Sequence, residues 1–220
     1  MITKPGQAVD RVPEYTGRVR YTAEAAKQYV QRDGPAHRAE MRMIEKAFTH
    51  VPRGTVSDVP CGGGRVSLWL ARNGYKVTAA DLSLPMLDFA RQNAARESLP
   101  ITVEKGDIEH LAYPDRHFDA IVCFRLFHHF PNPSVRARAV AELCRVAGRH
   151  VLISYFTPYC GTSAKRMLQN KFFGKKIVKF ATPLREVKLY FATHGFKLVE
   201  NFARAPLLHT MNLAVFERQA

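Results

Sequence analysis

The sequence contains no long apolar run. None approaches the roughly 20 apolar residues that a membrane-spanning helix needs. Residues 1–15, MITKPGQAVDRVPEY, also lack the apolar stretch of a signal peptide. We therefore expect a chain that is not exported, has no transmembrane segment and works in the cytoplasm.

Cysteine is scarce as well. The four cysteines, Cys61, Cys123, Cys144 and Cys160, are widely spaced and form no C-x-x-C pair. This pattern gives little support to a disulfide framework or a zinc site. We expect reduced thiols and no bound metal.

Acidic residues are outnumbered. There are 19 Asp and Glu residues against 33 Lys and Arg residues, which gives a formal net charge of +14. Such an excess raises the local concentration of anionic partners, whether nucleic acid, a phospholipid surface or an acidic small molecule. The charge alone does not choose among these partners.

What the sequence does have is the size and apolar content of one globular domain. It has 220 residues, of which 46% are hydrophobic, so it can form one sizeable core. No internal repeat, low-complexity tract or linker divides it. We predict a single domain over residues 1–220.

Strands and helices alternate along most of this domain. An irregular lead-in and two helices, over 23–31 and 36–49, come first, and the alternation predicts a doubly wound α/β fold with helices on both faces of a mostly parallel sheet. The short connection 203–210 predicts that the last strand runs antiparallel. The predicted strands are 55–59, 75–80, 101–104, 118–124, 150–156, 196–202 and 211–216.

Local signals place the helices between these strands. Helices are predicted over 65–73 and 133–146. Ser83 is the predicted N-cap of a helix that carries Met86. Thr182 and Pro183 are the predicted N-cap and first residue of another helix.

A glycine-rich loop follows the first strand and is the strongest functional signal. It reads Asp58-Val59-Pro60-Cys61-Gly62-Gly63-Gly64. In doubly wound sheets, ligands bind beyond the carboxyl ends of the strands, and glycines let the backbone turn sharply and approach a ligand closely. The alternative is a tight strand-to-helix turn that needs glycine for its own sake.

Acids recur after the next two strands. Asp81 ends the second strand, where a carboxylate can accept hydrogen bonds from both hydroxyls of a ribose. Gly106-Asp107-Ile108 follows the third strand, where a carboxylate and a backbone N–H could bind an adenine edge. Alone, Asp81 could be a helix-capping acid and Asp107 a turn former. Their order after the glycine loop favours a cofactor that contains a nucleoside.

This combination resembles the class I S-adenosylmethionine-dependent methyltransferases, whose small-domain members have a first motif of the form D-V-x-C-G-x-G. The resemblance is close over 51–156 and looser over the C-terminal strands. It implies a Rossmann-like seven-stranded sheet of order 3-2-1-4-5-7-6, S-adenosyl-L-methionine as cofactor and S-adenosyl-L-homocysteine as product. Within the single domain we expect an N-terminal helical lid or lead-in over 1–50, a cofactor-binding core over 51–156, and a substrate-side cover together with the C-terminal strands over 157–220.

The resemblance assigns roles to individual residues. The loop implies contacts to the methionine portion, Asp81 a contact to the ribose, and Asp107 and Ile108 contacts to the adenine. Many relatives have Gly where Pro60 stands, and proline fixes φ and removes a donor, which leaves the fine geometry of the loop open. The implied cofactor-binding residues are Asp58, Pro60, Cys61, Gly62, Gly64, Asp81, Leu82, Met86, Gly106, Asp107, Ile108, Phe124 and Arg125.

A domain that binds NAD is the nearest competitor. Its G-x-G-x-x-G pattern, counted from Gly62, needs Gly or Ala at position 67, where the sequence has Ser67. Asp58 would also repel a pyrophosphate, whereas a sulfonium and an ammonium group suit it. We therefore predict S-adenosylmethionine and not NAD.

Candidate catalytic residues follow the fourth strand. Methyl transfer chiefly requires alignment of the nucleophile and exclusion of water, and a base helps when the nucleophile carries a proton. His128 or His129 could be that base; the alternative is that the pair packs or caps the next helix. Tyr155 and Tyr159 are equally placed candidates for the acceptor pocket. No N-P-P-[FY]-like tetrapeptide is present, which disfavours methylation of DNA bases or glutamine.

A basic segment follows the fifth strand. The resemblance implies a cover over the substrate, and a cationic cover suits a phosphorylated or carboxylated acceptor. A basic helix over 163–180 on a membrane surface is another interpretation, although charged and apolar residues do not separate cleanly around such a helix; a solvated basic face is a third. The cations are Lys165, Arg166, Lys171, Lys175, Lys176 and Lys179, with no acid among them.

We therefore predict methyl transfer to an O or N atom of a small or lipid-linked anionic acceptor. One alternative is an RNA-modifying methyltransferase, because the N-terminal region is also basic, but no recognised nucleic-acid-binding module accompanies it. Another is a non-catalytic protein that binds the cofactor or a partner. Tyr21 and Tyr29 could line a lid or simply pack.

Overall fold

The computed structural model describes residues 24, 26–27, 34–162, 179–206 and 208–219. The predicted helix over 23–31 falls largely outside the described residues. So do Tyr21, Tyr29 and the basic segment up to residue 178.

Seven strands form one mixed sheet, in the order β3-β2-β1-β4-β5-β7-β6. Neighbours among β1 to β5 pair in parallel, whereas β7 runs antiparallel to both β5 and β6. The predicted strand order and the antiparallel last strand are confirmed. The strands are β1 (Thr55–Asp58), β2 (Lys76–Asp81), β3 (Ile101–Lys105), β4 (Phe118–Cys123), β5 (Ala147–Phe156), β6 (Phe196–Ala203) and β7 (Met211–Arg218).

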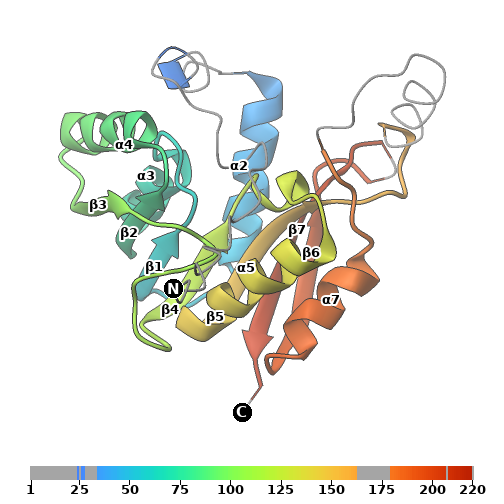
Figure 1. Ribbon diagram of the computed structural model, residues 1–220. Helices are drawn as coiled ribbons and strands as arrows, with labels where there is room; N and C mark the ends of the chain where they lie inside the picture. Colours follow the sequence, from blue (N-terminus) through green and yellow to red (C-terminus); the bar gives the residue numbers. More distant parts are fainter. Residues whose placement is uncertain (1–23, 25, 28–33, 163–178, 207, 220) are drawn as a thin grey trace, which may run out of the picture.

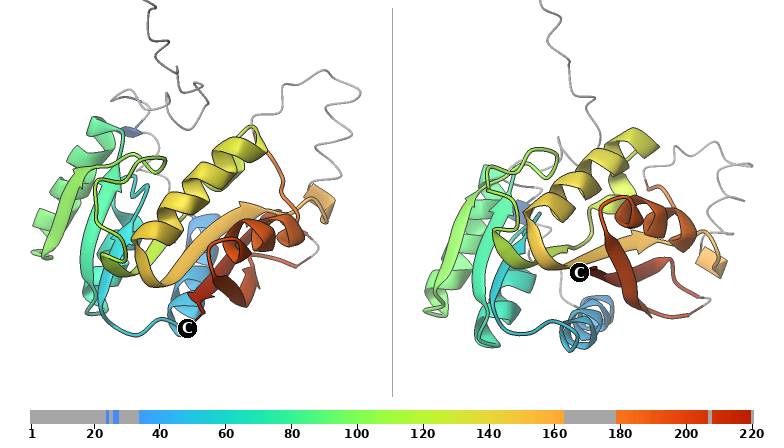
Figure 2. Two further views of the ribbon diagram at one scale, coloured as in Figure 1. Left: turned by 60° about the horizontal axis from the view of Figure 1, so that its bottom comes forward. Right: turned by 90° about the horizontal axis from the view of Figure 1, so that it is seen from below.

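Helices cover both faces of this sheet (Figures 1 and 2). The first three pack on one face and the last two on the other, and a short 3-10 helix, η1 (Phe127–His129), follows β4. No helix within the described residues has the length and apolarity to cross a membrane. The helices are α2 (Pro35–Phe48), α3 (Arg65–Arg72), α4 (Leu84–Arg96), α5 (Pro133–Val146) and α7 (Leu184–Ala192).

The central strand β4 shows why the sheet is buried on both sides. Ile121 and Cys123 pack in the cluster beneath α5 and α7, whereas Ala120 and Val122 pack in the cluster beneath α2 and α3. Asp119 is the exposed exception on this strand. Its Oδ2 accepts hydrogen bonds from Thr55 N at 2.7 Å and Thr55 Oγ1 at 2.8 Å. The acid thus fastens the start of β4 to the start of β1.

One predicted helix start is wrong. The N-cap of α7 is Pro183, with no side-chain hydrogen bond, and the helix begins at Leu184. Thr182 is buried, and its N–H donates to the carbonyl oxygen of Phe156 at 2.7 Å. That bond holds Thr182 at the end of β5, so it cannot cap the helix. The predicted cap at Ser83 is confirmed, because its Oγ accepts from Met86 N at 3.4 Å.

We expect Asp119→Ala to lower the free energy of unfolding by about 1–3 kcal/mol, because it leaves both Thr55 donors without their acceptor. The exposed pair of Asp88 and Arg91 provides a control, and Asp88→Ala should cost about 0.5 kcal/mol or less. Urea unfolding of both variants measures the difference. Equal losses would show that the contact between Asp119 and Thr55 adds nothing beyond a surface charge pair.

Candidate active site

The glycine loop joins β1 to α3 at the carboxyl edge of the sheet. The Val59–Pro60 peptide bond is cis, and Gly62 and Gly64 have φ of 54° and 86°. A Cβ on Gly64 would lie 3.2 Å from the Cβ of Ala90 on α4. The turn and the packing of α4 therefore require glycine at position 64 without reference to any ligand. The acids around the loop carry the information about a ligand.

Asp81 joins this loop to the end of β2. Its Oδ2 accepts from Gly62 N at 2.9 Å, and its Oδ1 accepts from Ser83 N at 2.9 Å. The side chain is buried, which raises its pKa, and the backbone hydrogen bonds oppose this rise. Because each carboxylate oxygen can accept two hydrogen bonds, Asp81 retains capacity for two further donors.

Asp58 lies on the neighbouring strand and is almost fully buried. Ser67 Oγ of α3 donates to its Oδ2 at 2.6 Å. Burial raises the pKa of Asp58 to about 7, the bonds from Ser67 oppose that rise, and the charge of Asp81 adds to it. Sequence reasoning uses Ser67 only as evidence against NAD and misses it as the partner of Asp58. Its place one turn into the helix that follows the loop is the signal that could have found it.

The third element of the site follows β3. Gly106 N donates to the carbonyl oxygen of Asp81 at 3.1 Å, and a Cβ on Gly106 would lie 2.9 Å from that of Ala80. Asp107 Oδ1 accepts from Glu109 N at 3.0 Å, which forms a local turn. The side chain of Ile108 is buried in the core. The ends of β1, β2 and β3 are thus directly connected through Gly62, Asp81 and Gly106.

The remaining predicted cofactor residues differ in exposure. Met86, in the first turn of α4, is buried, and Leu82 is half-buried. In the loop, Pro60 is half-buried and Cys61 is buried, and burial raises the pKa of the Cys61 thiol well above its usual range. Cys61 is therefore a neutral packing residue of the loop and not a thiolate.

Phe124 and Arg125 lie just beyond β4, on the same edge of the sheet. The Phe124 ring is buried beneath the guanidinium of Arg65, whose Cζ is 5.8 Å from the ring centroid. Arg125 adopts a left-handed conformation with φ of 68°, and its N–H donates to Ser154 Oγ at 2.6 Å. The chain therefore turns sharply at Arg125 and sends its side chain towards α2.

The paired histidines lie on η1 and pack. The His128 ring stacks on Phe156, with centroids 3.9 Å apart and 3° between the planes, and His128 is 1% exposed. His129 is half-buried beside it, with ring centroids 4.3 Å apart. The N-cap of α5 is Asn132, whose Oδ1 accepts from Val135 N at 3.0 Å. The histidines therefore do not cap α5.

The two candidate tyrosines point to different environments. Tyr155 is buried in the cluster beneath α5 and α7, and its hydroxyl donates to Asn201 Oδ1 at 3.1 Å. Burial raises the pKa of Tyr155 to about 12. Tyr159 projects into solvent with 73% of its surface exposed. The structure therefore does not bring the two hydroxyls together.

Sequence reasoning misses Glu40, a buried carboxylate on α2. Its Oε2 accepts from Arg65 Nη2 at 3.0 Å, and its Oε1 accepts from Arg125 Nη1 at 2.5 Å. The signal is present in the sequence, because Glu40 precedes the buried Met43, Ile44 and Ala47 at helical spacing. An acid on an apolar helix stripe needs a buried partner.

Comparison with known proteins shows which family and which relatives this chain resembles. Residues 56–149 match the family described as "Methyltransferase domain". The chain is similar to the ubiquinone biosynthesis O-methyltransferase of Coxiella burnetii, with 37% identity over 94 residues, 43% of this chain and 40% of the relative. The protein of the same name from Proteus mirabilis is 37% identical over 101 residues, 45% of this chain and 40% of the relative. The match thus spans about two fifths of these curated relatives.

Solved structures share the fold over a larger part of the chain. Magnesium protoporphyrin IX methyltransferase from Synechocystis PCC 6803, solved with bound S-adenosylhomocysteine, has a TM-score of 0.74 at 17% identity, covering 88% of this chain and 93% of that one. The PH0226 protein from Pyrococcus horikoshii OT3 has a TM-score of 0.71 at 18% identity, covering 88% and 99%. The chain therefore has the class I methyltransferase fold. Within it, residues 56–149 match the methyltransferase-domain family model.

Because the folded pKa of Asp58 lies above its unfolded value of about 4, the contribution of Asp58 to the stability of the wild type falls as the pH rises from about 4 to 7. Asp58→Asn does not titrate, so its stability relative to wild type should increase over that range and then level off, by on the order of 2–4 kcal/mol. Denaturant unfolding between pH 5 and 8 measures this. In the control Asp119→Asn, the relative stability should stay flat, because hydrogen bonds from Thr55 lower the pKa of Asp119. If the stability of Asp58→Asn relative to wild type did not change with pH, the raised pKa of Asp58 would be contradicted.

Proposed function

We propose that this chain transfers a methyl group from S-adenosyl-L-methionine to an oxygen or nitrogen atom of a small anionic acceptor. The observation that carries the proposal is the pairing of two buried carboxylates, Asp58 and Asp81, with the glycine loop between them. The sulfonium and ammonium groups of S-adenosylmethionine would supply the positive charge that favours their ionised forms. The pyrophosphate of NAD would add negative charge instead.

Each part of the cofactor has proposed partners. The loop from Asp58 to Gly64 would surround the methionine portion, and Asp81 would accept from the ribose hydroxyls. Leu82 and Met86 would lie on one side of the adenine and the segment from Gly106 to Ile108 on the other. Phe124 and Arg125 would line the pocket between cofactor and acceptor. The hydrogen bonds that join Gly62 and Gly106 to Asp81 support this arrangement, because they hold the three proposed binding segments together at one edge of the sheet.

When bound, S-adenosylmethionine supplies a methyl carbon activated by the sulfonium, so the chain has to align the acceptor and exclude water. Should the acceptor arrive with its proton, a base is required. Besides His128 and His129, Tyr155 is a candidate for this catalytic role. Tyr155 and His128 are each 1% exposed, and the Tyr155 hydroxyl already donates to Asn201 Oδ1. We therefore assign proton acceptance to the half-buried His129.

Two further observations refine the acceptor. The name O-methyltransferase of the relatives supports an oxygen atom on a small molecule. Many described arginines are paired with acids, as in Arg138 with Glu109 and Arg72 with Glu97, which does not favour an RNA-binding surface there. Lys179, the last cation of the basic segment, is half-buried with its Nζ 5.7 Å from the Phe156 ring centroid. A role of 163–180 at a membrane surface stays a prediction.

The cofactor assignment is tested by calorimetric titration with S-adenosylmethionine, S-adenosylhomocysteine and NAD. We expect micromolar binding of the first two, roughly −8 kcal/mol, and none of NAD. Asp81→Asn should weaken both by about 10- to 100-fold, because it removes an anionic acceptor of two hydrogen bonds. Asp88→Asn, on the exposed side of α4, is the matched control.

Thermal unfolding of Asp81→Asn checks that the loop remains folded, since Asp81 also holds Gly62 and Ser83. Wild-type affinity in a folded Asp81→Asn protein would contradict the ribose assignment, and binding of NAD alone would contradict the proposed function. Cofactor binding without transfer to any of a broad acceptor panel would favour the non-catalytic alternative.

The assignment of His129 is tested with an acceptor found in a screen of phenols and carboxylates. His129→Gln should lower kcat by about 100-fold or more and remove the fall in rate at low pH that protonation of the base causes. His194→Gln, at an exposed position two residues after α7, is the control. A pH–rate profile identical to that of wild type would mean that the acceptor reaches the site already ionised.

A further inference from the structure

The Glu40 cluster consists of one buried carboxylate and three arginines from separate elements. Arg65 begins α3, Arg125 follows β4, and Arg204 follows β6, with its Nη1 3.9 Å from Glu40 Oε1. Three guanidinium groups therefore surround a single acid. Pairs elsewhere, such as Arg138 with Glu109, set one cation against one acid.

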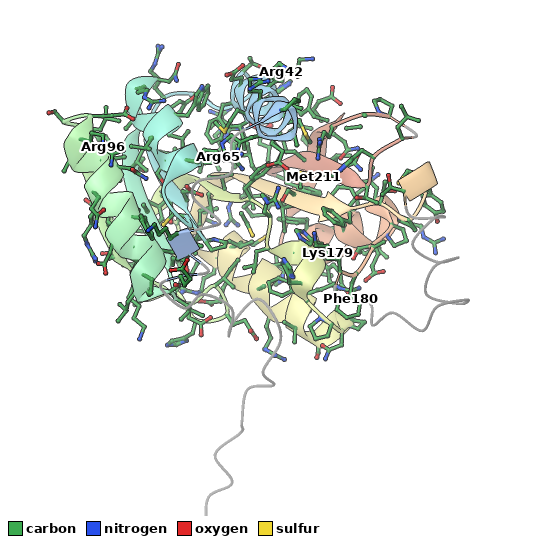
Figure 3. The ribbon with its side chains drawn as sticks, turned by 90° about the horizontal axis from the view of Figure 1, so that it is seen from above. Arg42, Arg65, Arg96, Lys179, Phe180 and Met211 are labelled. Carbon is green, nitrogen blue, oxygen red and sulfur yellow. The ribbon has the colours of Figure 1, made fainter. Side chains whose placement is uncertain are left out.

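The position of this cluster matches that of a ligand site. Arg65, Arg125 and Arg204 all lie at the carboxyl edge of the sheet, because β6 is antiparallel to β7 and therefore runs in the same direction as β4 and β5. Figure 3 shows the molecule from above. Arg65 lies on the side of α2, and Lys179 and Phe180 lie beside α5 on the opposite side. The cluster is thus next to the glycine loop, on the side away from β2 and β3.

The acid of the Glu40 cluster is buried, whereas its three arginines are partly exposed. Glu40 is 2% exposed, whereas Arg65, Arg125 and Arg204 are 24%, 27% and 21% exposed. The carboxylate is therefore covered while each guanidinium reaches the surface. A molecule that approaches from solvent meets the cations first, with the acid behind them.

The cluster also has hydrogen-bonding capacity that its own acid does not use. Among the described residues, Arg65 Nη1 is buried with no hydrogen-bond partner. Arg204 is oriented by His209, with Nη1 and Nε2 2.9 Å apart. Asp58 also interacts electrostatically with the cluster, because the charge of Arg65 lowers the pKa of Asp58. With Asp58 and Glu40 both ionised, the cations are still in excess.

From these observations we infer that the Glu40 cluster is the binding site for the oxyanion of the acceptor, a carboxylate or a phosphate. This inference rests on the proposed function and deepens it by naming the residues that select the acceptor. Guanidinium groups bind both oxyanions through paired N–H donors. Glu40 is a positioning residue. Its two carboxylate oxygens hold Arg65 and Arg125 in place for the oxyanion of the acceptor.

The test uses benzoate and inorganic phosphate as probes, titrated calorimetrically into the full-length protein with and without saturating S-adenosylhomocysteine. Wild type should bind at least one of them, and the stronger probe identifies the oxyanion. Arg65→Gln and Arg204→Gln should each weaken that probe by about tenfold, because a hydrogen bond to a charged group is lost. Arg138→Gln removes the same charge at a one-to-one pair and should leave affinity unchanged.

Glu40→Gln separates recognition from a purely structural role. Removal of one negative charge behind the guanidinium groups should raise probe affinity several-fold. A cluster that only attaches α2 to the sheet would instead leave probe affinity the same in Glu40→Gln, Arg65→Gln and Arg204→Gln. That result, or the absence of probe binding in wild type, would overturn the inference. Thermal unfolding of each variant confirms that it is folded.

These outcomes are distinct from a failure of the proposed function. S-adenosylhomocysteine is titrated separately into every protein, so loss of cofactor binding and loss of oxyanion binding are measured independently. If wild type binds the probe and the arginine variants bind it more weakly, the Glu40 cluster is an oxyanion site even where the cofactor does not bind, whereas its role in binding a methyl acceptor fails together with the proposed function.

Discussion

The carboxylate of Asp81 is the contact on which the site depends. It accepts one backbone N–H from the loop after β1 and one from the start of α4, and its own carbonyl oxygen accepts the N–H of Gly106 after β3. Three loops that are far apart in sequence are therefore held by one residue. A charged acceptor is well suited to this role, because hydrogen bonds to a carboxylate are stronger than those between neutral groups.

A carboxylate in this position has an electrostatic consequence. Asp58 and Asp81 are both buried at the ends of adjacent strands. The charge of Asp81 disfavours ionisation of Asp58, and both acids disfavour ionisation of the nearby Cys61 thiol. On the side of the loop away from β2, the Glu40 cluster reverses the balance with three guanidinium groups. The carboxyl edge of the sheet thus has an acidic part, at Asp58 and Asp81, and a basic part, the Glu40 cluster.

Most helix bounds could be predicted, because these depend on local patterns. The alternation of elements and the short connection before β7 predicted a mostly parallel sheet with an antiparallel last strand, and a hydroxyl before an apolar-periodic segment sufficed for the cap at Ser83. The order of the strands came from the resemblance to class I methyltransferases and not from local patterns. Thr182 misled because its backbone bonds to the end of β5, a tertiary contact that no local pattern indicates. The acids at the strand ends could also be predicted, because the predicted bounds of each strand show which residue comes at its end.

What the sequence could not indicate is which side chains converge from distant segments. Glu40, Arg65, Arg125 and Arg204 span most of the chain and meet only because α2 packs across the sheet. The fate of Tyr155 likewise depends on Asn201, two strands away in the sheet. Side chains that alternate across a strand differ in environment, and only the packed structure decides which face holds the site.

The contact between Gly64 and Ala90 limits how this sequence can change over evolutionary time. A Cβ at position 64 would lie only 3.2 Å from the Cβ and 3.3 Å from the Cα of Ala90, so α4 is seated directly against the glycine loop. A larger side chain at position 90 would lift α4 from the loop and separate Ser83 from Asp81. Positions 64 and 90 are therefore tied to small residues together, and descendants of this chain can diverge at one of them only by rebuilding the other.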